Sequence, residues 1–264
     1  MKLPLFQVDA FANRIFSGNP AAVVPLSDWL ADDVMQSIAT ENQLSETAFF
    51  VEEEGSFQLR WFTPATEVDL CGHATLASAH VLYRELGYGG EQVIFQTRSG
   101  ALEVTRTAGG YEMDFPTDPP EPAPSAKDIL SSSLDIEIAE AFRGREDYVA
   151  IVESENDVRN LQPDIRAVAH LEARGVLVSA AGEEVDFVSR CFFPRFGIDE
   201  DPVTGSAHTT LAPLWAERLG RKQLTARQIS PRGGEVGCRL EGERVVLAGE
   251  ATTFLRGEME LPNA

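Results

Sequence analysis

Two short segments combine small residues with the expected start of a helix, a pattern that can bind an anion. Gly72 precedes a helix-forming run at 74–86, and Thr204-Gly205-Ser206 precedes a similar run at 207–219. The first N–H groups of a helix have no partner within it, and the helix dipole favours negative charge there. If both starts face one ligand, Gly72, Gly205 and Ser206 offer N–H groups to a carboxylate. Ordinary helix capping is the alternative interpretation.

The acidic composition narrows the choice of ligand. The 264 residues include 42 Asp and Glu against 22 Lys and Arg, a formal net charge of −20. Nucleic acid and anionic membrane surfaces need a basic protein surface. No apolar run approaches the roughly 20 residues that span a bilayer. We therefore expect no nucleic-acid or membrane partner. The net charge does not exclude a small anionic substrate such as a carboxylate, because a local positive field can exist inside an acidic protein.

The sequence carries no familiar cofactor or metal motif. Its glycine-rich segments do not form GxGxxG or GxxxxGK[ST], and its cysteines and histidines show no CxxC or HExxH spacing. We expect neither a cofactor nor a metal. The cysteines, Cys71, Cys191 and Cys238, are odd in number and far apart, which favours a reducing cytoplasm over a disulfide framework.

An internal repeat organises the chain. The segment FQLRWFTP at 57–64 recurs 130 residues later as FVSRCFFP at 187–194, and 96–104 matches 228–236. Each copy reads as an alternating strand, a Pro-containing loop, a helix and a further strand. The repeat predicts two similar α+β halves related by a pseudo-twofold axis.

A proline-rich segment marks the boundary between the halves. The stretch 116–124 holds five prolines in nine residues, which excludes a helix or a central strand there. We expect an N-terminal half at 1–115 and a C-terminal half at 116–251. The tail at 254–261 alternates like a last strand, and the pattern leaves open which half it joins.

Four segments carry a family resemblance: FSGNPAAV at 16–23, NQLSETAF at 42–49, RWFTPATEVDLCGHAT at 60–75 and DPVTGSA at 201–207. Together they resemble the phenazine-biosynthesis isomerase (PhzF-like) family, a branch of the diaminopimelate-epimerase fold superfamily. The resemblance implies two pseudo-symmetric α+β domains, each a curved, mostly antiparallel sheet wrapped around a central helix. It also implies an active site between the domains, no cofactor and a homodimer, and it places the last strand, about 252–264, in the N-terminal domain.

The resemblance also assigns roles to individual residues. Glu46, His73 and Asp201 match the family's catalytic positions, and Gly72, Gly205 and Ser206 would bind the substrate carboxylate. Glu46 is flanked by apolar strand residues, so we expect its carboxylate to be partly desolvated. The alternatives are a surface glutamate, a helix-capping histidine and an Asp-Pro turn residue.

These assignments imply a cofactor-independent isomerase that moves a proton within a small carboxylate through a single glutamate, similar to trans-2,3-dihydro-3-hydroxyanthranilate isomerase. An amino-acid or hydroxy-acid epimerase or racemase with two cysteine bases is one alternative. Cys71 stands where related racemases carry one of those cysteines, but Pro202 occupies the expected position of the second, so we expect Cys71 to be a buried, inert thiol. A non-catalytic carboxylate-binding protein is the other alternative.

Overall fold

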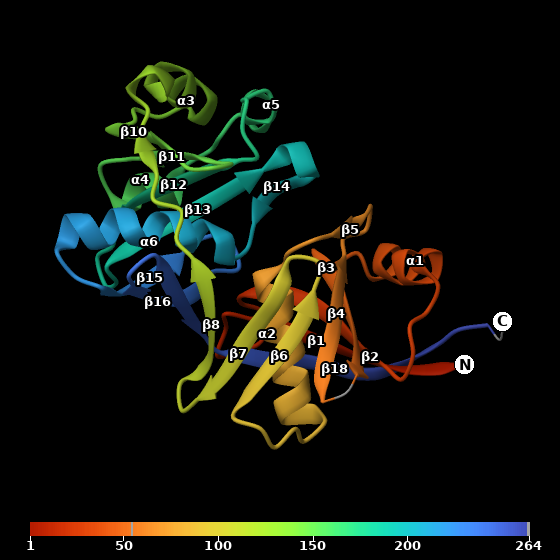
Figure 1. The fold of residues 1–264 in the computed structure, drawn as a ribbon. Helices are drawn as coiled ribbons and strands as arrows, with labels where there is room; N and C mark the ends of the chain where they lie inside the picture. Colours follow the sequence, from red (N-terminus) through yellow and green to blue (C-terminus); the bar gives the residue numbers. More distant parts are fainter. Residues whose placement is uncertain (54, 263–264) are drawn as a thin grey trace. The chain divides into compact units, whose positions relative to one another are not determined.

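The computed structural model describes residues 1–53 and 55–262, which divide into two units (Figure 1). Unit 1 is Met1–Asp114 with Ala248–Ala264, and unit 2 is Phe115–Leu247. The expected last strand at about 252–264 includes residues 263–264, which lie outside the described residues. No helix of the described chain is long and apolar enough to cross a membrane.

Unit 1 contains one continuous series of paired strands. Strand β1 lies between β18 and β2 and is antiparallel to both, and β2 is parallel to β3. Strand β4 is antiparallel to β3 and β5 and parallel to β6. Strands β6, β7 and β8 follow as an antiparallel series. The elements are β1 Lys2–Ala10, β2 Asn19–Leu26, α1 Asp32–Asn42, β3 Glu46–Glu53, β4 Ser56–Phe62, β5 Glu67–Val68, α2 Gly72–His80, β6 Gln92–Thr97, β7 Gly100–Thr107, β8 Gly110–Pro116 and β18 Ala251–Glu260.

Helix α2 is the centre of unit 1. Every residue from His73 to His80 is buried, including the small residues that predominate in this helix. A helix that is buried on all sides needs neighbours all around it. It contacts β1, β2, β3, β7 and β18, so the strands surround the helix (Figure 1).

Unit 2 pairs its strands in the same order. Strand β10 is antiparallel to β9 and β11; β11 and β12 are parallel; β12 and β13 are antiparallel; β13 pairs antiparallel with β14 and parallel with β15; and β15 and β16 are antiparallel. The elements are β9 Glu121–Pro122, α3 Lys127–Leu134, β10 Glu140–Arg143, β11 Tyr148–Ile151, α4 Glu155–Asn160, α5 Ile165–Ala169, β12 Val176–Ala181, β13 Phe187–Phe193, β14 Ile198–Asp201, α6 Gly205–Leu219, β15 Gln223–Gln228, β16 Gly234–Glu241 and β17 Arg244–Gly249.

The internal repeat of the sequence is therefore a repeat of structure. Helix α6 takes the position in the order of elements that α2 takes in unit 1, and it is also largely buried. A bidentate ion pair recurs as well: Nε and Nη2 of Arg60 donate to Glu67 at 2.7 and 2.8 Å, and Arg190 donates to Glu200 at the same distances. The α+β fold of two similar domains, each with a sheet around a central helix, is confirmed.

The two central helices differ at their C-terminal ends. The sequence pattern predicts a continuous helix at 74–86, but α2 ends at His80 and is followed by a π-helical turn over Val81–Glu85. Helix α6 continues to Leu219 and ends at Gly220, which adopts a left-handed conformation with φ +64°. Glycine has no Cβ to clash there, so it ends a helix at little cost.

Candidate active site

Glu46 is the first residue of β3, directly after the turn that follows α1. Gln43 ends α1 in a left-handed conformation, and the side chain of Asn42 donates to Oγ1 of Thr47 at 3.0 Å. The parallel ladder with β2 places Glu46 opposite Ala21. Although β3 begins here, Glu46 is only 9% exposed. The sequence therefore places a carboxylate at the edge of an apolar strand, where water has little access.

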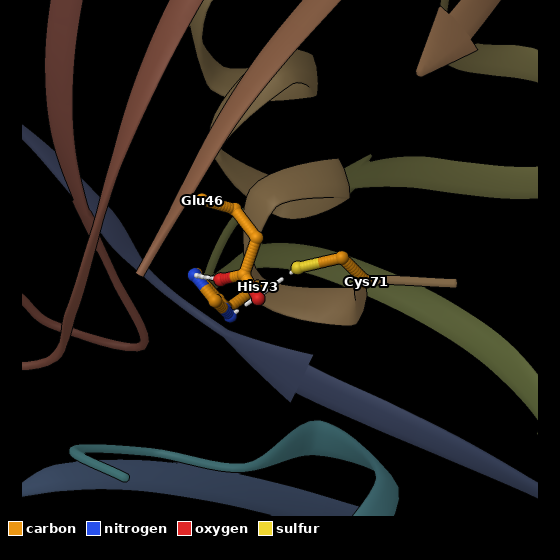
Figure 2. A group of neighbouring side chains, drawn as sticks. All are labelled: Glu46, Cys71 and His73. Atoms are coloured by element: carbon orange, nitrogen blue, oxygen red, sulfur yellow. Dashed lines mark hydrogen bonds and ion pairs between the residues drawn. The ribbon is translucent and has the colours of Figure 1, made fainter. Parts of the chain in front are cut away.

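His73 and Cys71 meet Glu46 from the start of α2. Nε2 of His73 lies 3.1 Å from Oε2 of Glu46, and Nδ1 of the same ring lies 3.5 Å from Sγ of Cys71 (Figure 2). The 3.1 Å separation is an ion-pair distance, but the two atoms are not aligned as a hydrogen bond. Both are buried without a hydrogen-bond partner among the described residues. Buried polar atoms are nearly always hydrogen-bonded, so these two point to a ligand.

The charges of this group are coupled. Burial by itself lowers the pKa of His73, but the neighbouring Cys71 and Glu46 side chains raise that pKa well above its ordinary value. Burial also raises the pKa of the Cys71 thiol, and the charge of Glu46 adds to this effect. The thiol is therefore neutral at neutral pH, so Glu46 supplies the negative charge that keeps a proton on His73.

These three side chains are also the group of donors best placed to hold a metal among the described residues. One ligand atom from each of Glu46, Cys71 and His73 can be chosen so that all lie within 4.8 Å. However, His73 presents a different nitrogen to each neighbour, Nδ1 to Cys71 and Nε2 to Glu46. A single ion binds only one of the two ring nitrogens. The arrangement therefore fits a row of side chains in pairwise contact better than a set of ligands that converge on one ion.

In unit 2, Asp201 lies at the end of β14, immediately before α6. Oγ1 of Thr204 donates to Oδ2 of Asp201. The side chain of Gln228 joins the segment, since Nε2 donates to the carbonyl of Asp201 at 2.7 Å and Oε1 accepts from the backbone N–H of Thr204 at 2.8 Å. Gln228 is fully buried. It fixes the backbone from Asp201 to the start of the helix.

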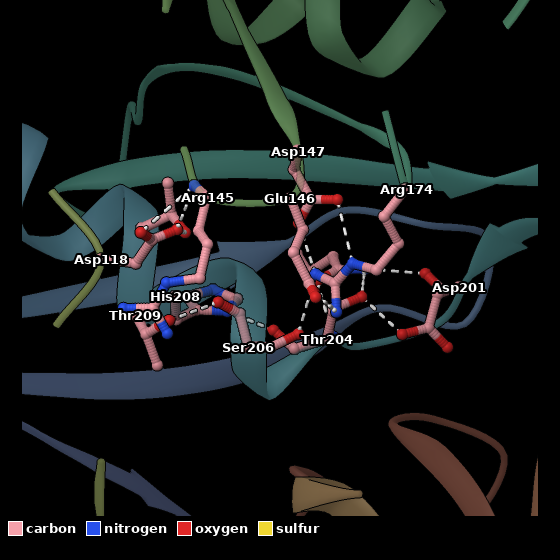
Figure 3. Close-up of polar contacts among 12 residues, drawn as sticks. Asp118, Arg145, Glu146, Asp147, Arg174, Asp201, Thr204, Ser206, His208 and Thr209 are labelled. Atoms are coloured by element: carbon pink, nitrogen blue, oxygen red, sulfur yellow. Dashed lines mark hydrogen bonds and ion pairs between the residues drawn. The ribbon is translucent and has the colours of Figure 1, made fainter. Parts of the chain in front are cut away.

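Ser206 is the second residue of α6 and contacts an ion pair whose carboxylate is buried. Nη2 of Arg174 donates to Oγ of Ser206 at 3.2 Å, and Nε of Arg174 donates to Oδ1 of Asp147 at 3.0 Å (Figure 3). Asp147 is only 3% exposed. Because Oγ of Ser206 accepts from Arg174, its own O–H remains available to donate to a ligand oxygen. Gly205 precedes it at the first position of the helix.

The structure thus groups the expected site residues by unit. Glu46, His73 and Gly72 lie together in unit 1, and Asp201, Gly205 and Ser206 lie together in unit 2. Gln228 and Arg174 are not among the site residues predicted from the sequence. The sequence does single out Gln228, because this residue begins the segment 228–236 that repeats 96–104. The sequence does not single out Arg174, because the partners of this residue are distant in sequence.

Comparisons with known proteins agree with this architecture. The family model described as "Phenazine biosynthesis-like protein" matches residues 8–257. An "uncharacterized isomerase" of Pseudomonas aeruginosa is 51% identical over 261 residues, covering 99% of this chain and 100% of the relative. A crystal structure of a PhzF-family protein from Enterococcus faecalis superposes with a TM-score of 0.96 at 47% identity, covering 99% of this chain and 100% of that chain.

A more distant structure extends the fold relationship. A hydroxyproline epimerase from Agrobacterium vitis matches with a TM-score of 0.64 at 9% identity, covering 97% of this chain and 92% of that chain. At this identity the match shows a shared fold. Both structures share the two-domain α+β architecture of this chain. The chain belongs to the phenazine biosynthesis-like family and is an isomerase of that family.

Proposed function

We propose that the protein is a cofactor-independent isomerase that moves a proton within a small carboxylate, with Glu46 as its single acid–base group. The observation that carries the proposal is the buried group of Glu46 and His73. Oε2 and Nε2 lie 3.1 Å apart, and neither has a hydrogen-bond partner among the described residues. Because these two polar atoms are buried without a hydrogen-bond partner in the described chain, both are available to a substrate. A carboxylate beside a protonated imidazole is suited to proton transfer.

The chemistry proceeds in two proton transfers. The carboxylate of Glu46 takes a proton from a carbon next to an alkene or carbonyl group, and the electron pair of the broken C–H bond moves into the conjugated system. His73, whose raised pKa keeps it protonated, donates a hydrogen bond to the substrate atom on which negative charge develops. The carboxylic acid of Glu46 then returns the proton to a different carbon on the same face. The double bond has moved, and no oxidant is needed.

The residues at the helix starts bind the rest of the substrate in this proposal. The N–H groups of Gly72 at the start of α2, and those of Gly205 at the start of α6, each suit a carboxylate, because helix N-termini favour negative charge. Ser206 adds its hydroxyl, and Asp201 accepts from a donor group of the substrate. This binding uses no lysine, which suits a chain of net charge −20.

The family resemblance supports a candidate for the substrate. Trans-2,3-dihydro-3-hydroxyanthranilate carries a carboxylate and a conjugated ring, and we propose it as the first compound to test. We further propose that the protein acts in a biosynthetic pathway in the cytoplasm as a homodimer, with no nucleic-acid or membrane partner and with neither a metal nor a cofactor.

A two-base epimerase or racemase is the second candidate, and one observation favours it. Sγ of Cys71 lies 3.5 Å from Nδ1 of His73, so the thiol is not remote from the acid–base group. In a two-base enzyme each base works on one face, and the loss of one base stops turnover. Cys71→Ala would then abolish activity, whereas the single-glutamate mechanism keeps measurable activity in that variant.

The experiment that tests the proposal is substrate turnover in D2O followed by proton NMR. The probe is trans-2,3-dihydro-3-hydroxyanthranilate, followed by a panel of small amino and hydroxy acids. A shifted double bond with solvent deuterium at one carbon supports the isomerase. Inversion of a stereocentre without a shifted double bond supports the epimerase instead. Thermal stabilisation by a carboxylate with no isotope exchange would show a binding protein and overturn the proposal.

A further inference from the structure

The side chain of Cys71 does not form the hydrogen bond that is usual at its position, the N-cap of a helix. Cys71 is the N-cap residue of α2, a position whose side chain commonly accepts a hydrogen bond from a backbone N–H of the first turn. Cys71 makes no such contact. It is 7% exposed, and its Sγ lies beside Nδ1 of His73. The thiol is thus buried against the catalytic histidine, and the backbone N–H of Ala74 in the first turn also acts on it.

The imidazole of His73 is consequently held on both sides. Cys71 faces Nδ1, and Glu46 faces Nε2 from a different element, the start of β3 (Figure 2). A half-turn of the ring would replace each nitrogen by a carbon, and both contacts would be lost. A buried nitrogen without a partner costs about 1–3 kcal/mol. The two contacts together define one ring orientation.

Unit 2 shows that the fold itself does not require this arrangement. Thr204 is the N-cap residue of α6, as Cys71 is of α2, and Ser206 matches His73. Oγ1 of Thr204 contacts Asp201, while Oγ of Ser206 contacts Arg174. The two side chains at the start of α6 thus have separate partners. The chain of contacts through Cys71, His73 and Glu46 is particular to unit 1.

We infer that Cys71 is a positioning residue, which holds the imidazole of His73 by Nδ1 so that Nε2 stays directed at Glu46. A thiol serves both protonation states of the ring, because S–H donates to a neutral Nδ1 and the sulfur accepts from Nδ1–H of an imidazolium. Each state leaves a proton on Nε2, the nitrogen beside Glu46. The role of this ring orientation in catalysis rests on the proposed function, whereas the contacts of His73 with Cys71 and Glu46 do not.

The inference revises the expectation of an inert thiol. Cys71 still does not act as a base, since burial raises the pKa of its thiol and only the neutral form is required. Its removal leaves Nδ1 buried without a partner and frees the ring to reorient. Replacement by serine keeps a group that donates and accepts at the same position.

The test is NMR of protein labelled with 15N-histidine, without any substrate. Wild type is compared with Cys71→Ala, Cys71→Ser and the control Cys238→Ala, which removes a buried thiol remote from His73 in sequence. Two-bond 15N–1H correlations report the protonation and hydrogen bonding of each ring nitrogen. His80 and His208, both buried, serve as internal reporters of an intact fold.

We expect the Nδ1 resonance of His73 to shift in Cys71→Ala, with a second set of ring signals as the ring reorients. In Cys71→Ser the Nδ1 resonance shifts because oxygen replaces sulfur, while Nε2 keeps its wild-type resonance and one set of signals remains. Cys238→Ala matches wild type. An unchanged Nδ1 resonance in both Cys71 variants would overturn the inference. If Cys71→Ala does not fold, Cys71→Ser alone decides between these outcomes.

This result is separable from the outcome for the proposed function. The NMR experiment uses no substrate, so a failure to find turnover leaves it intact. Conversely, proton transfer by Glu46 can be demonstrated even if the His73 signals show no influence of Cys71. For any substrate found, Cys71→Ala should lower kcat with KM little changed, and Cys71→Ser should restore most of the activity.

Discussion

Glu46 and His73 approach to 3.1 Å in a buried environment, from the start of β3 and the start of α2 respectively. This proximity makes the charge of one residue a determinant of the protonation of the other. The position of Glu46 in unit 1 corresponds to a position in unit 2 that has no room for a side chain. The pKa of His73 and the difference between Glu46 in unit 1 and Gly175 in unit 2 can therefore both be tested by substitution.

Neutralising Glu46 should lower the pKa of His73. Glu46→Gln removes a negative charge that helps to raise this pKa, and burial then favours the neutral ring. We expect His73 to titrate at a lower pH than in wild type, measured by 15N-histidine NMR across pH 4–10. The exposed Glu52, on the same strand, provides the control Glu52→Gln, which should leave the titration unchanged. An equal effect of both variants would contradict the assignment.

Gly175 occupies in unit 2 the position that Glu46 occupies in unit 1. Thr47 pairs with Phe62 and Val176 pairs with Phe192, so the residues before Thr47 and Val176 correspond. A Cβ on Gly175 would lie 2.2 Å from a ring carbon of Phe193 and 2.4 Å from the carbonyl oxygen of Phe192. The second unit therefore has no room for a side chain there.

Gly175→Ala should accordingly destabilise the protein. Overpacking against a backbone oxygen costs about 1–3 kcal/mol in the free energy of unfolding, which denaturant titration measures. Gly89→Ala is the control, because a Cβ there meets nothing within 4 Å. A Gly175→Ala variant as stable as Gly89→Ala would show that unit 2 does have room for a side chain at this position.

Removing Arg174 should also reduce stability. Arg174 donates to both carboxylate oxygens of Asp147, which is almost fully buried. Arg174→Ala leaves this carboxylate unpaired, at a cost of about 3–5 kcal/mol. Arg227→Ala breaks ion pairs with the exposed Glu184 and Glu235 and should cost about 1 kcal/mol or less. The two variants are compared by urea unfolding, and similar losses would count against the buried ion pair.

His208 should make the fold sensitive to acid. Burial lowers the pKa of His208 from 6.5 to about 4, so between these values the unfolded chain binds a proton that the folded chain does not. Stability therefore falls as pH drops from about 6.5, with a loss of about 3 kcal/mol from this group by pH 4. Unfolding titrations at a series of pH values measure the loss.

Variants separate the contribution of His208 from the general effect of acid. His208→Gln should be less stable than wild type at pH 7, because it disturbs a buried site, but its stability should fall less steeply on acidification. The exposed His170 gives the control His170→Gln, which should follow the wild-type slope. A His208→Gln slope equal to that of wild type would rule out this origin of acid sensitivity.

The sequence predicts those parts of the protein that depend on local pattern or on the repeat. The alternation of apolar and polar residues at 57–62, repeated at 187–193, predicts both strands. The glycines at 72 and 205 predict both helix starts. The fold class followed from the repeat together with the family resemblance. The π-helical turn at Val81–Glu85 was missed because the apolar spacing of 74–86 fits an uninterrupted helix equally well.

Contacts between distant segments were less predictable. The family motif singled out Glu46 and His73, but nothing in the sequence indicates that Nδ1 of His73 faces Cys71 while Nε2 faces Glu46. These orientations depend on how β3 and the start of α2 pack together. The ion pair of Arg174 with Asp147 joins residues 27 positions apart, and neither stands in a motif.

Proton transfer by Glu46 can be measured as the incorporation of solvent deuterium into a substrate that the protein turns over in D2O. Wild type, Glu46→Gln and Glu52→Gln are incubated with trans-2,3-dihydro-3-hydroxyanthranilate, or with whichever carboxylate the panel shows to be turned over, and the product is examined by proton NMR. We expect deuterium in the product of wild type and Glu52→Gln, and a rate at least 100-fold lower for Glu46→Gln. Incorporation by Glu46→Gln at the wild-type rate would contradict proton transfer by Glu46.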